Sequence, residues 1–236
     1  MARREDTRPR SEQVAAQIRA QIIAGDFAPG DQLPATGALV ELYGIANTTV
    51  QKALNILKDE GFITAQRGKG VYVSDRERLT VTVGTYFAPS PTGFSYELLN
   101  VAEVVPPAEV ARALNLATEA RTVQRKRLMR HDGDPVELDY SYYAVDLVAG
   151  TDLAAKRRIK GGAPRVLEEL GYPEREFTDR VSVRMPTTEE IEMLDLPEVP
   201  VIRQFRTVFS DNDRPVAVNI MIKGGHRYDL VYRQTA

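Results

Sequence analysis

Polar side chains with the chemistry to contact nucleic acid gather in two short segments near the N-terminus. Amide and hydroxyl groups can read base edges in the major groove, whereas Arg and Lys contact phosphates. The first segment begins a predicted helix and the second forms a predicted turn. The candidate DNA-binding residues are Asn47, Thr48, Thr49, Gln51 and Lys52 in the first segment, and Arg67, Gly68 and Lys69 in the second.

A second group of candidate residues lies on predicted strands further along the chain. Arg125 and Arg127 alternate on a strand predicted over residues 122–130, and Asp139 and Ser141 share one face of the next strand. A strand inside a packed domain cannot leave a cation against apolar neighbours. These residues therefore predict a pocket for a small anion, or else surface ion pairs. Weaker candidates for the same pocket are Arg180, Arg203, Arg206 and Tyr228.

Two predicted helices joined by a tight turn position the first segment. One helix is predicted over residues 35–43, and the second runs from residue 47 to Gly61, with the side chains of residues 47–49 as its caps. The buried stripe of the second helix is predicted to consist of Val50, Ala53, Leu54 and Leu57. Its polar N-terminal end is then left outside.

Alternating strand patterns follow these helices. Residues 62–64 and 71–73 flank the glycine-rich turn 67–70 and predict a β-hairpin. Together with an upstream helix over residues 11–24, capped by Ser11, this predicts a winged helix-turn-helix. Two helices and a turn are also ordinary core packing, and the cationic hairpin is what favours DNA binding.

The rest of the chain contains an internal near-repeat. Residues 106–136, predicted as helix, strand, turn and strand, are echoed by residues 186–216. The repeat predicts two halves that build one antiparallel sheet with pseudo-symmetry. Predicted strands cover residues 98–105, 122–130, 135–143, 179–185, 201–210 and 215–222, and predicted helices cover 108–116, 163–170 and 187–194. A weak strand over residues 79–87 and a loop over 88–93 precede them.

Composition excludes several classes of chemistry. The 236 residues carry a net charge of −2 and no cysteine, so neither a disulfide nor a cysteine-ligated zinc site is possible. His131 and His226 are isolated from any nucleophile or metal-ligand pattern, so we expect no catalytic residue, no metal and no cofactor. No apolar run approaches the length of a membrane span, and we expect a cytoplasmic protein without a membrane partner.

The N-terminal segment resembles the GntR family of bacterial transcription regulators. The match includes residues 25–34, GDFAPGDQLP, which look like the family's G-x-x-x-P-G-x-x-L-P connection. Three positions where the family usually carries cations hold Gly37, Asn47 and Gln51 instead. Asn and Gln read adenine, whereas Arg prefers guanine, so we expect an operator with adenines at positions where guanines are usual.

Residues 98–232 resemble the UTRA ligand-sensing domain, which accompanies GntR-type DNA-binding domains in the HutC subfamily. The resemblance implies an α+β chain with an antiparallel-sheet domain related to chorismate lyase. It also implies that Arg125 and Arg127 meet an anionic effector, and that Asp139 stands where many members carry Glu. The domains expected are a DNA-binding domain at 1–75, a linker and first strand at 76–95, and an effector-binding domain at 96–236.

The function that these resemblances imply is transcription regulation. We expect a repressor that binds operator DNA as a homodimer and responds to a small, anionic effector. One alternative is a chorismate-lyase-like enzyme domain tethered to a DNA-binding domain. Another is a constitutive regulator with a vestigial pocket.

Overall fold

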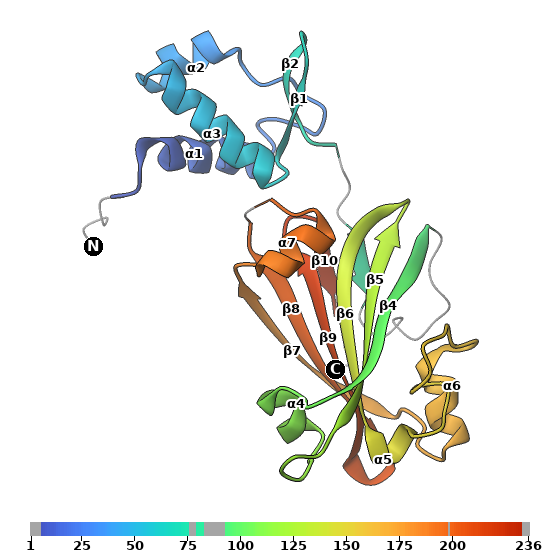
Figure 1. Cartoon of the computed structure of the whole chain (residues 1–236). Coiled ribbons are helices and arrows are strands. Elements are labelled where there is room, and N and C mark those ends of the chain that lie inside the picture. Colours follow the sequence, from blue (N-terminus) through green and yellow to red (C-terminus); the bar gives the residue numbers. More distant parts are fainter. Residues whose placement is uncertain (1–5, 76–78, 83–92, 198, 233–236) are drawn as a thin grey trace. The chain divides into compact units, whose positions relative to one another are not determined.

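The chain folds into two units, which we call the N-terminal unit and the C-terminal unit (Figure 1). They comprise Met1–Arg78 and Leu79–Ala236. The computed structural model describes residues 6–75, 79–82, 93–197 and 199–232. Among the helices that lie in these ranges, none is long and apolar enough to cross a membrane.

The N-terminal unit contains three helices and a hairpin. They are α1 (Arg10–Ala24), α2 (Thr36–Tyr43), α3 (Asn47–Asp59), β1 (Ile63–Gln66) and β2 (Gly70–Val73). The predicted stripe of α3 is confirmed, because Val50, Ala53, Leu54 and Leu57 are all buried. They pack with Val14 and Ile18 of α1 in one apolar core. This is the predicted winged helix-turn-helix.

The backbone before α2 braces the hairpin. The Leu33 N–H donates to the Val71 carbonyl at 2.9 Å, and Gln32 Nε2 donates to the Lys69 carbonyl at 2.9 Å. Gly70 has a φ of 125°, and a Cβ on it would lie 2.5 Å from Gln32 Nε2. A larger residue at position 70 would therefore push away the side chain that holds the tip of the hairpin.

Two predicted helix caps are wrong. The N-cap of α1 is Pro9, with Ser11 inside the helix, and the N-cap of α3 is Ala46. Ala46 has the extended backbone (φ −66°, ψ 149°) of an N-cap, so Asn47 already has helical geometry and makes no cap hydrogen bond. The polar side chains at the start of α3 therefore make no cap hydrogen bonds.

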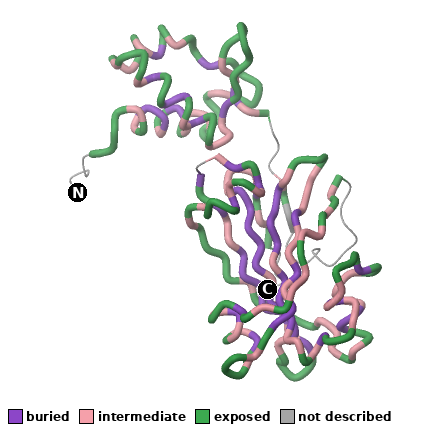
Figure 2. The backbone as a smooth tube through the Cα atoms, in the orientation of Figure 1, coloured by how far each residue is buried: buried purple, intermediate pink, exposed green. Residues whose placement is uncertain are grey.

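The C-terminal unit is built on a six-stranded antiparallel sheet in the order β4-β5-β6-β9-β8-β7. The strands are β4 (Phe94–Val104), β5 (Thr122–His131), β6 (Asp134–Ala144), β7 (Glu176–Arg184), β8 (Val201–Ser210) and β9 (Arg214–Gly224). Buried residues run along its central strands, whereas the outer strand β7 is mostly exposed (Figure 2). A separate parallel pair joins β3 (Leu79–Thr82) to β10 (Tyr228–Val231).

Helices cover both faces of the sheet. The first face packs against α4 (Ala108–Ala113) and α7 (Thr188–Leu194), in a core that includes Leu128 and Val218. The second face packs against α5 (Val145–Val148) and α6 (Gly162–Glu169), in a core that includes Val123. We refer to these as the α4/α7 face and the α5/α6 face.

The topology contains the predicted duplication. Each half runs strand, helix, strand, strand, and the halves meet where β6 pairs with β9. Equivalent residues lie 80 positions apart in α4 and α7 and in β6 and β9, and 79 apart in β5 and β8. Tyr140 pairs with its own equivalent, Ile220, so a pseudo-twofold axis passes through this pair. Asn115 and Asp195, which are also 80 apart, both have a positive φ, at 51° and 48°.

Element boundaries differ from the predicted ones in places. Strand β4 begins at Phe94, β7 begins at Glu176 and α4 ends at Ala113. Strand β10 was not predicted, because its partner β3 is distant in the sequence. The predicted strand at 79–87 is described only over Leu79–Thr82, and its remainder, like residues 88–92 of the predicted loop, lies outside the described residues.

A partly buried carboxyl group, that of Glu174, lies just outside the sheet. Glu174 precedes β7, and its Oε2 atom is buried without a hydrogen-bond partner among the described residues. Burial raises the pKa of Glu174 to about 7, although nearby Arg206 acts in the opposite direction. A carboxyl group with this pKa is protonated in the folded chain at pH values where the unfolded chain has released the proton.

This difference predicts a stability that falls with rising pH. Between the ordinary pKa of 4.5 and about 7, the folded chain binds more protons at Glu174 than the unfolded chain does. The free energy of unfolding should therefore decrease through this window by on the order of 2 kcal/mol and then level off. In urea unfolding of Glu174→Gln, the free energy of unfolding should not show this decrease. The stability of the variant relative to the wild type should therefore increase between pH 5 and pH 8. Glu176→Gln, at an exposed position, is the control. If the stability of Glu174→Gln differed from that of the wild type by the same amount at pH 5 and at pH 8, the raised pKa of Glu174 would be contradicted.

Candidate nucleic-acid interface and effector site

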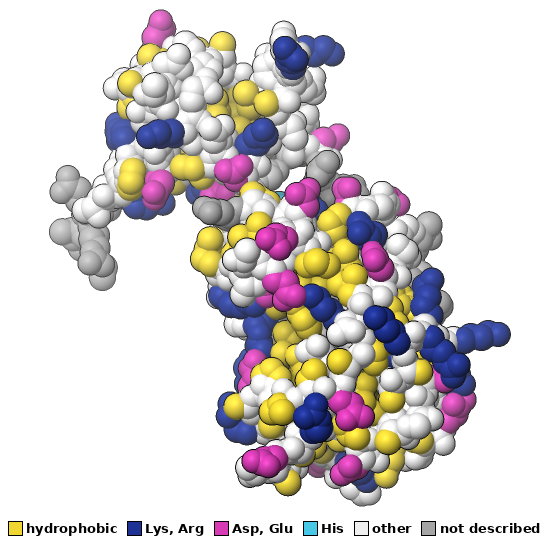
Figure 3. Space-filling model, in the orientation of Figure 1, with side chains coloured by type: hydrophobic (Ala, Val, Ile, Leu, Met, Phe, Trp, Pro, Cys, Tyr) yellow, Lys and Arg dark blue, Asp and Glu magenta, His cyan; other side chains and the backbone are white. Residues whose placement is uncertain are grey.

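The predicted DNA-binding residues lie on the surface of the N-terminal unit. Asn47, Thr48, Gln51 and Lys52 are exposed along the start of α3, and Thr49 is half-buried. The hairpin residues Arg67, Gly68 and Lys69 are exposed as well. Figure 3 shows Lys and Arg side chains projecting from the end of the hairpin.

One local contact orients the start of α3. Gln51 Nε2 donates to Thr36 Oγ1 at 3.3 Å, which links α3 to the first residue of α2. Thr36 and Gly37 stand where the GntR family, which this segment resembles, usually has an acidic residue followed by an arginine. The resulting surface is polar and mostly neutral, with Lys52 as the cation nearest to Gln51 in the helix.

Charged and polar side chains occupy neighbouring strands on the α5/α6 face. The strand register places them in a cross-strand row, in which each residue is the partner of the next. The row consists of Arg125, Ser141, Asn219, Arg206 and Asp179. Cross-strand partners share a face of the sheet, so charges from both halves meet in this layer.

Arg125 holds the segment between α5 and α6. Its guanidinium donates to the carbonyl oxygens of Leu153 at 2.8 Å, Ala155 at 2.9 Å and Arg157 at 2.8 Å. Burial lowers the pKa of Arg125. Sequence patterns give no sign of these contacts, because a carbonyl oxygen belongs to every residue type. Arg125 therefore positions the loop that covers this face.

Arg206 forms a bidentate ion pair with Asp179 on the adjacent strand. Its Nε and Nη2 atoms donate to Asp179 Oδ1 and Oδ2 at 2.8 and 2.7 Å, and both side chains are almost completely buried. The Arg206 guanidinium also lies 3.8 Å from the centre of the Phe177 ring. This bidentate pair joins β7 to β8.

Besides the contacts of Arg125 and of Arg206, the α5/α6 face has a further buried cluster, and Tyr228 lies beside it. Burial raises the pKa of its hydroxyl, and its ring lies 5.8 Å from Lys223 Nζ. Lys223 Nζ pairs with Glu137 Oε2 at 3.0 Å and donates to Gln204 Oε1 at 3.0 Å. Because Glu137 and Lys223 are register partners, this pair joins β6 to β9.

The structure brings Arg127, Asp139 and Ser141 into direct contact. Arg127 Nη2 donates to Asp139 Oδ1 and to Ser141 Oγ, both at 2.9 Å, and Ser141 Oγ donates to Asp139 Oδ1 at 2.8 Å. Asp139 is 1% exposed, whereas 26% of the Arg127 side chain is exposed. Asp139 Oδ2 is buried and accepts no hydrogen bond from the described part of the chain.

An aromatic ring adjoins this contact. The Arg127 and Arg158 guanidinium groups lie 5.8 and 4.4 Å from the centre of the Tyr96 ring. Neither Tyr96 nor Arg158 was among the predicted site residues. Arg158 comes from the loop between α5 and α6, and no sequence pattern places that loop beside β4. The arrangement offers an anionic group two cations and one ring, and it offers a hydrogen-bond donor a buried carboxylate oxygen.

Arg180 lies on the opposite face from the other candidates. It follows Asp179 on β7, so its side chain points to the α4/α7 face, where Nη2 donates to Glu109 Oε2 at 3.0 Å. Arg203, the further weak candidate, also pairs with Glu109. The described residues contain no cluster of His, Asp or Glu that could hold a metal ion.

Comparison with known proteins matches both units. The family described as bacterial regulatory proteins, gntR family, matches residues 10–73, and the UTRA domain family matches residues 93–229. An uncharacterised HTH-type transcriptional regulator of Streptomyces coelicolor is 30% identical over 95% of this chain and 92% of its own length. An Escherichia coli protein, "Probable fructoselysine utilization operon transcriptional repressor", is 24% identical over 92% of this chain and 91% of its own length.

Solved structures share the fold. A crystal structure of a GntR-family transcriptional regulator has a TM-score of 0.67 at 21% identity, covering 97% of this chain and 98% of that one. PhnF from Mycobacterium smegmatis has a TM-score of 0.58 at 18% identity, with 94% and 99% covered. The chain therefore belongs to the GntR family of bacterial regulatory proteins, in the HutC subfamily that carries a UTRA domain, which is a family of transcription regulators and not of enzymes.

Proposed function

We propose that this regulator is a repressor that acts in the cytoplasm, binds operator DNA as a homodimer and is controlled by a small anionic effector. The observation that carries the effector proposal is the contact between partly exposed Arg127 and buried Asp139. A buried ion pair adds little to stability by itself. When one member of the pair is also open to solvent, as Arg127 is, the pair is a good candidate for a ligand-binding site.

The contact supports a particular effector chemistry. The fork of Arg127 would bind a carboxylate or phosphate, with Arg158 as a second cation beside Tyr96. Asp139 Oδ2 would accept a hydrogen bond from a hydroxyl or amine of the same molecule, because this buried atom accepts none from the described residues. We assign Arg125 a positioning role, since its donors hold the covering loop.

The N-terminal unit would read the operator through α3. Asn47 and Gln51 are exposed and carry amides, which pair bidentately with adenine. We therefore infer that adenines stand where the family's arginines usually meet guanines. Selection of binding sites from random DNA measures this directly, and recovery of guanines at those positions would exclude it.

The homodimer would use the outer edge of β7. This edge strand exposes Val181 and Val183 by 45% and 66%, and Met185, which directly follows the strand, is exposed by 56%. An exposed edge strand with apolar side chains is a template for pairing with another chain. A second copy supplies the same strand, and sedimentation velocity of the wild type and Val183→Lys would measure the association.

The hairpin predicts a salt-dependent effect. Arg67→Ala and Lys69→Ala should each weaken specific and non-specific DNA binding alike, because phosphate contacts carry little sequence information. Each change should flatten the slope of log K against log salt concentration by about one unit. Titrations by fluorescence anisotropy would measure both slopes, with exposed Lys58→Ala at the end of α3 as the control. Wild-type slopes in both hairpin variants would place the tip away from the backbone of DNA.

The Arg127 contact predicts a loss of effector response. Losing one buried charge-assisted bond costs about 2–5 kcal/mol, so Arg127→Ala should bind the effector roughly 30-fold more weakly or worse. Operator affinity without effector should stay at the wild-type level, because Arg127 lies in the C-terminal unit. Calorimetry with sugar phosphates and hydroxy acids that raise the wild-type Tm would test this.

Arg130→Ala is the matched control for this experiment. Arg130 lies on the same strand and forms a surface pair with Glu97, at 3.6 Å. Equal loss in both variants, or none in Arg127→Ala, would refute the assigned role of Arg127.

A further inference from the structure

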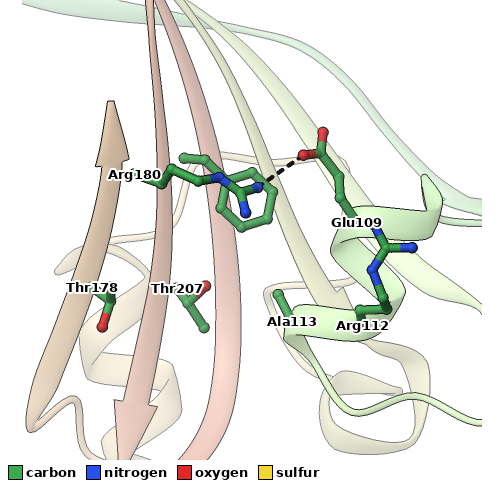
Figure 4. Close-up of a pocket in the computed structure, with 7 residues that line it drawn as sticks. Glu109, Arg112, Ala113, Thr178, Arg180 and Thr207 are labelled. Carbon is green, nitrogen blue, oxygen red and sulfur yellow. Dashed lines mark hydrogen bonds and ion pairs between the residues drawn. The ribbon is translucent and has the colours of Figure 1, made fainter. Parts of the chain in front are cut away.

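A pocket of about 350 Å³ lies on the α4/α7 face, between α4 and the outer strands β7 and β8 (Figure 4). Ala113 and Arg112 line it from the helix, and Thr178, Arg180 and Thr207 line it from the strands. It lies on the opposite side of the sheet from the contact between Arg127 and Asp139. The two places cannot therefore belong to one ligand site.

The duplication explains why this pocket is open. Ala113 is equivalent to Met193 of α7, which packs against the core of this face. Thr207 pairs with Val218, and the equivalent pairing in the first half is Leu128 with Leu138, so Thr207 is equivalent to Leu128. At the pseudo-symmetric position under α7, the large apolar side chains Met193 and Leu128 take the places of Ala113 and Thr207, and the space they would fill is the pocket.

The lining of the pocket also differs in charge. Arg112 is equivalent to Glu192 of α7, and the Arg112 side chain makes no ion pair or hydrogen bond with any described residue. Arg180 pairs with Glu109 and lies 4.6 Å from the centre of the Phe205 ring. The first half therefore carries a cation, Arg112, where the second half has an acid, Glu192.

The floor of the pocket supplies hydroxyl groups. Thr178 and Thr207 are register partners on β7 and β8, so their side chains stand side by side. Neither hydroxyl is hydrogen-bonded to the described residues, and both line the pocket. Two free hydroxyls below two arginines form a donor set for an oxyanion.

We propose that this pocket is a second ligand site, which takes a small molecule bearing one carboxylate or phosphate group. Arg112 and Arg180 bind the anionic group, the two threonines donate to its oxygens, and the Phe205 ring contacts the apolar remainder of the ligand. The site is independent of the proposed effector site, because none of its residues belongs to the α5/α6 face.

Filling the pocket tests the proposal. Ala113→Met with Thr207→Leu introduces the residue types, Met193 and Leu128, that occupy the pseudo-symmetric position, so the fold should tolerate the change, and Tm would verify this. Calorimetry with inorganic phosphate and with succinate should give wild-type binding of at least one probe. The filled variant and Arg112→Ala should bind that probe at least tenfold more weakly, whereas Glu192→Ala and Arg130→Ala should leave this binding unchanged.

The outcomes separate the possibilities. Preference for succinate identifies a carboxylate ligand, and preference for phosphate identifies a phosphate ester. Binding that survives in the filled variant, or no wild-type binding of either probe at millimolar concentration, overturns the proposal. If the filled variant fails to fold, Arg112→Ala with Thr178→Ala replaces it, since both side chains are exposed.

Discussion

Charged side chains buried on the α5/α6 face are stable only where each meets an opposite charge or several carbonyl oxygens. This requirement fixes how the strands of the C-terminal unit pair. Arg206 with Asp179 joins β8 to β7, and Lys223 with Glu137 joins β9 to β6. A shift of one strand by one residue would move its charges to the α4/α7 face, away from the partners that they meet on the α5/α6 face. The buried charges therefore specify the register as well as occupying the interior.

The same requirement distinguishes the proposed effector site from its surroundings. Arg206 and Lys223 are enclosed with their partners, whereas a quarter of the Arg127 side chain is exposed beside the buried Asp139. A ligand that replaces solvent there would strengthen a contact already formed within the sheet. It would also touch Arg158, which comes from the loop held by Arg125, so ligand binding and loop position are physically linked. Such a link can produce control only if the ligand favours one loop arrangement over another.

Periodicity in the sequence predicted most of the fold, because helices and hairpins carry local signals. The stripe of α3, the hairpin of β1 and β2, and the duplicated halves all follow from spacing. Long-range relations were harder to predict. Strand β10 pairs with a segment far away in the sequence, and Arg125 finds its partners among carbonyl oxygens that any residue would supply. Alternation along β7 predicted that Arg180 and Asp179 lie on opposite faces of the sheet. It could not predict which of these two faces also holds the other candidate residues, because that depends on how β7 pairs with β8.

In the proposed mode of DNA binding, the N-terminal unit separates affinity from sequence reading more than its resemblance to the family suggests. Neutral amides at Asn47 and Gln51 can discriminate bases but add little to the attraction of phosphates. That attraction then depends on the few exposed cations, of which Lys52 lies in α3 and Arg67 and Lys69 lie in the hairpin. The brace from Gln32 to the Lys69 carbonyl consequently matters for function, because it holds the hairpin tip in a fixed position relative to the rest of the unit. A loose tip would weaken binding at every sequence, whereas a change in α3 would alter which sequence is preferred.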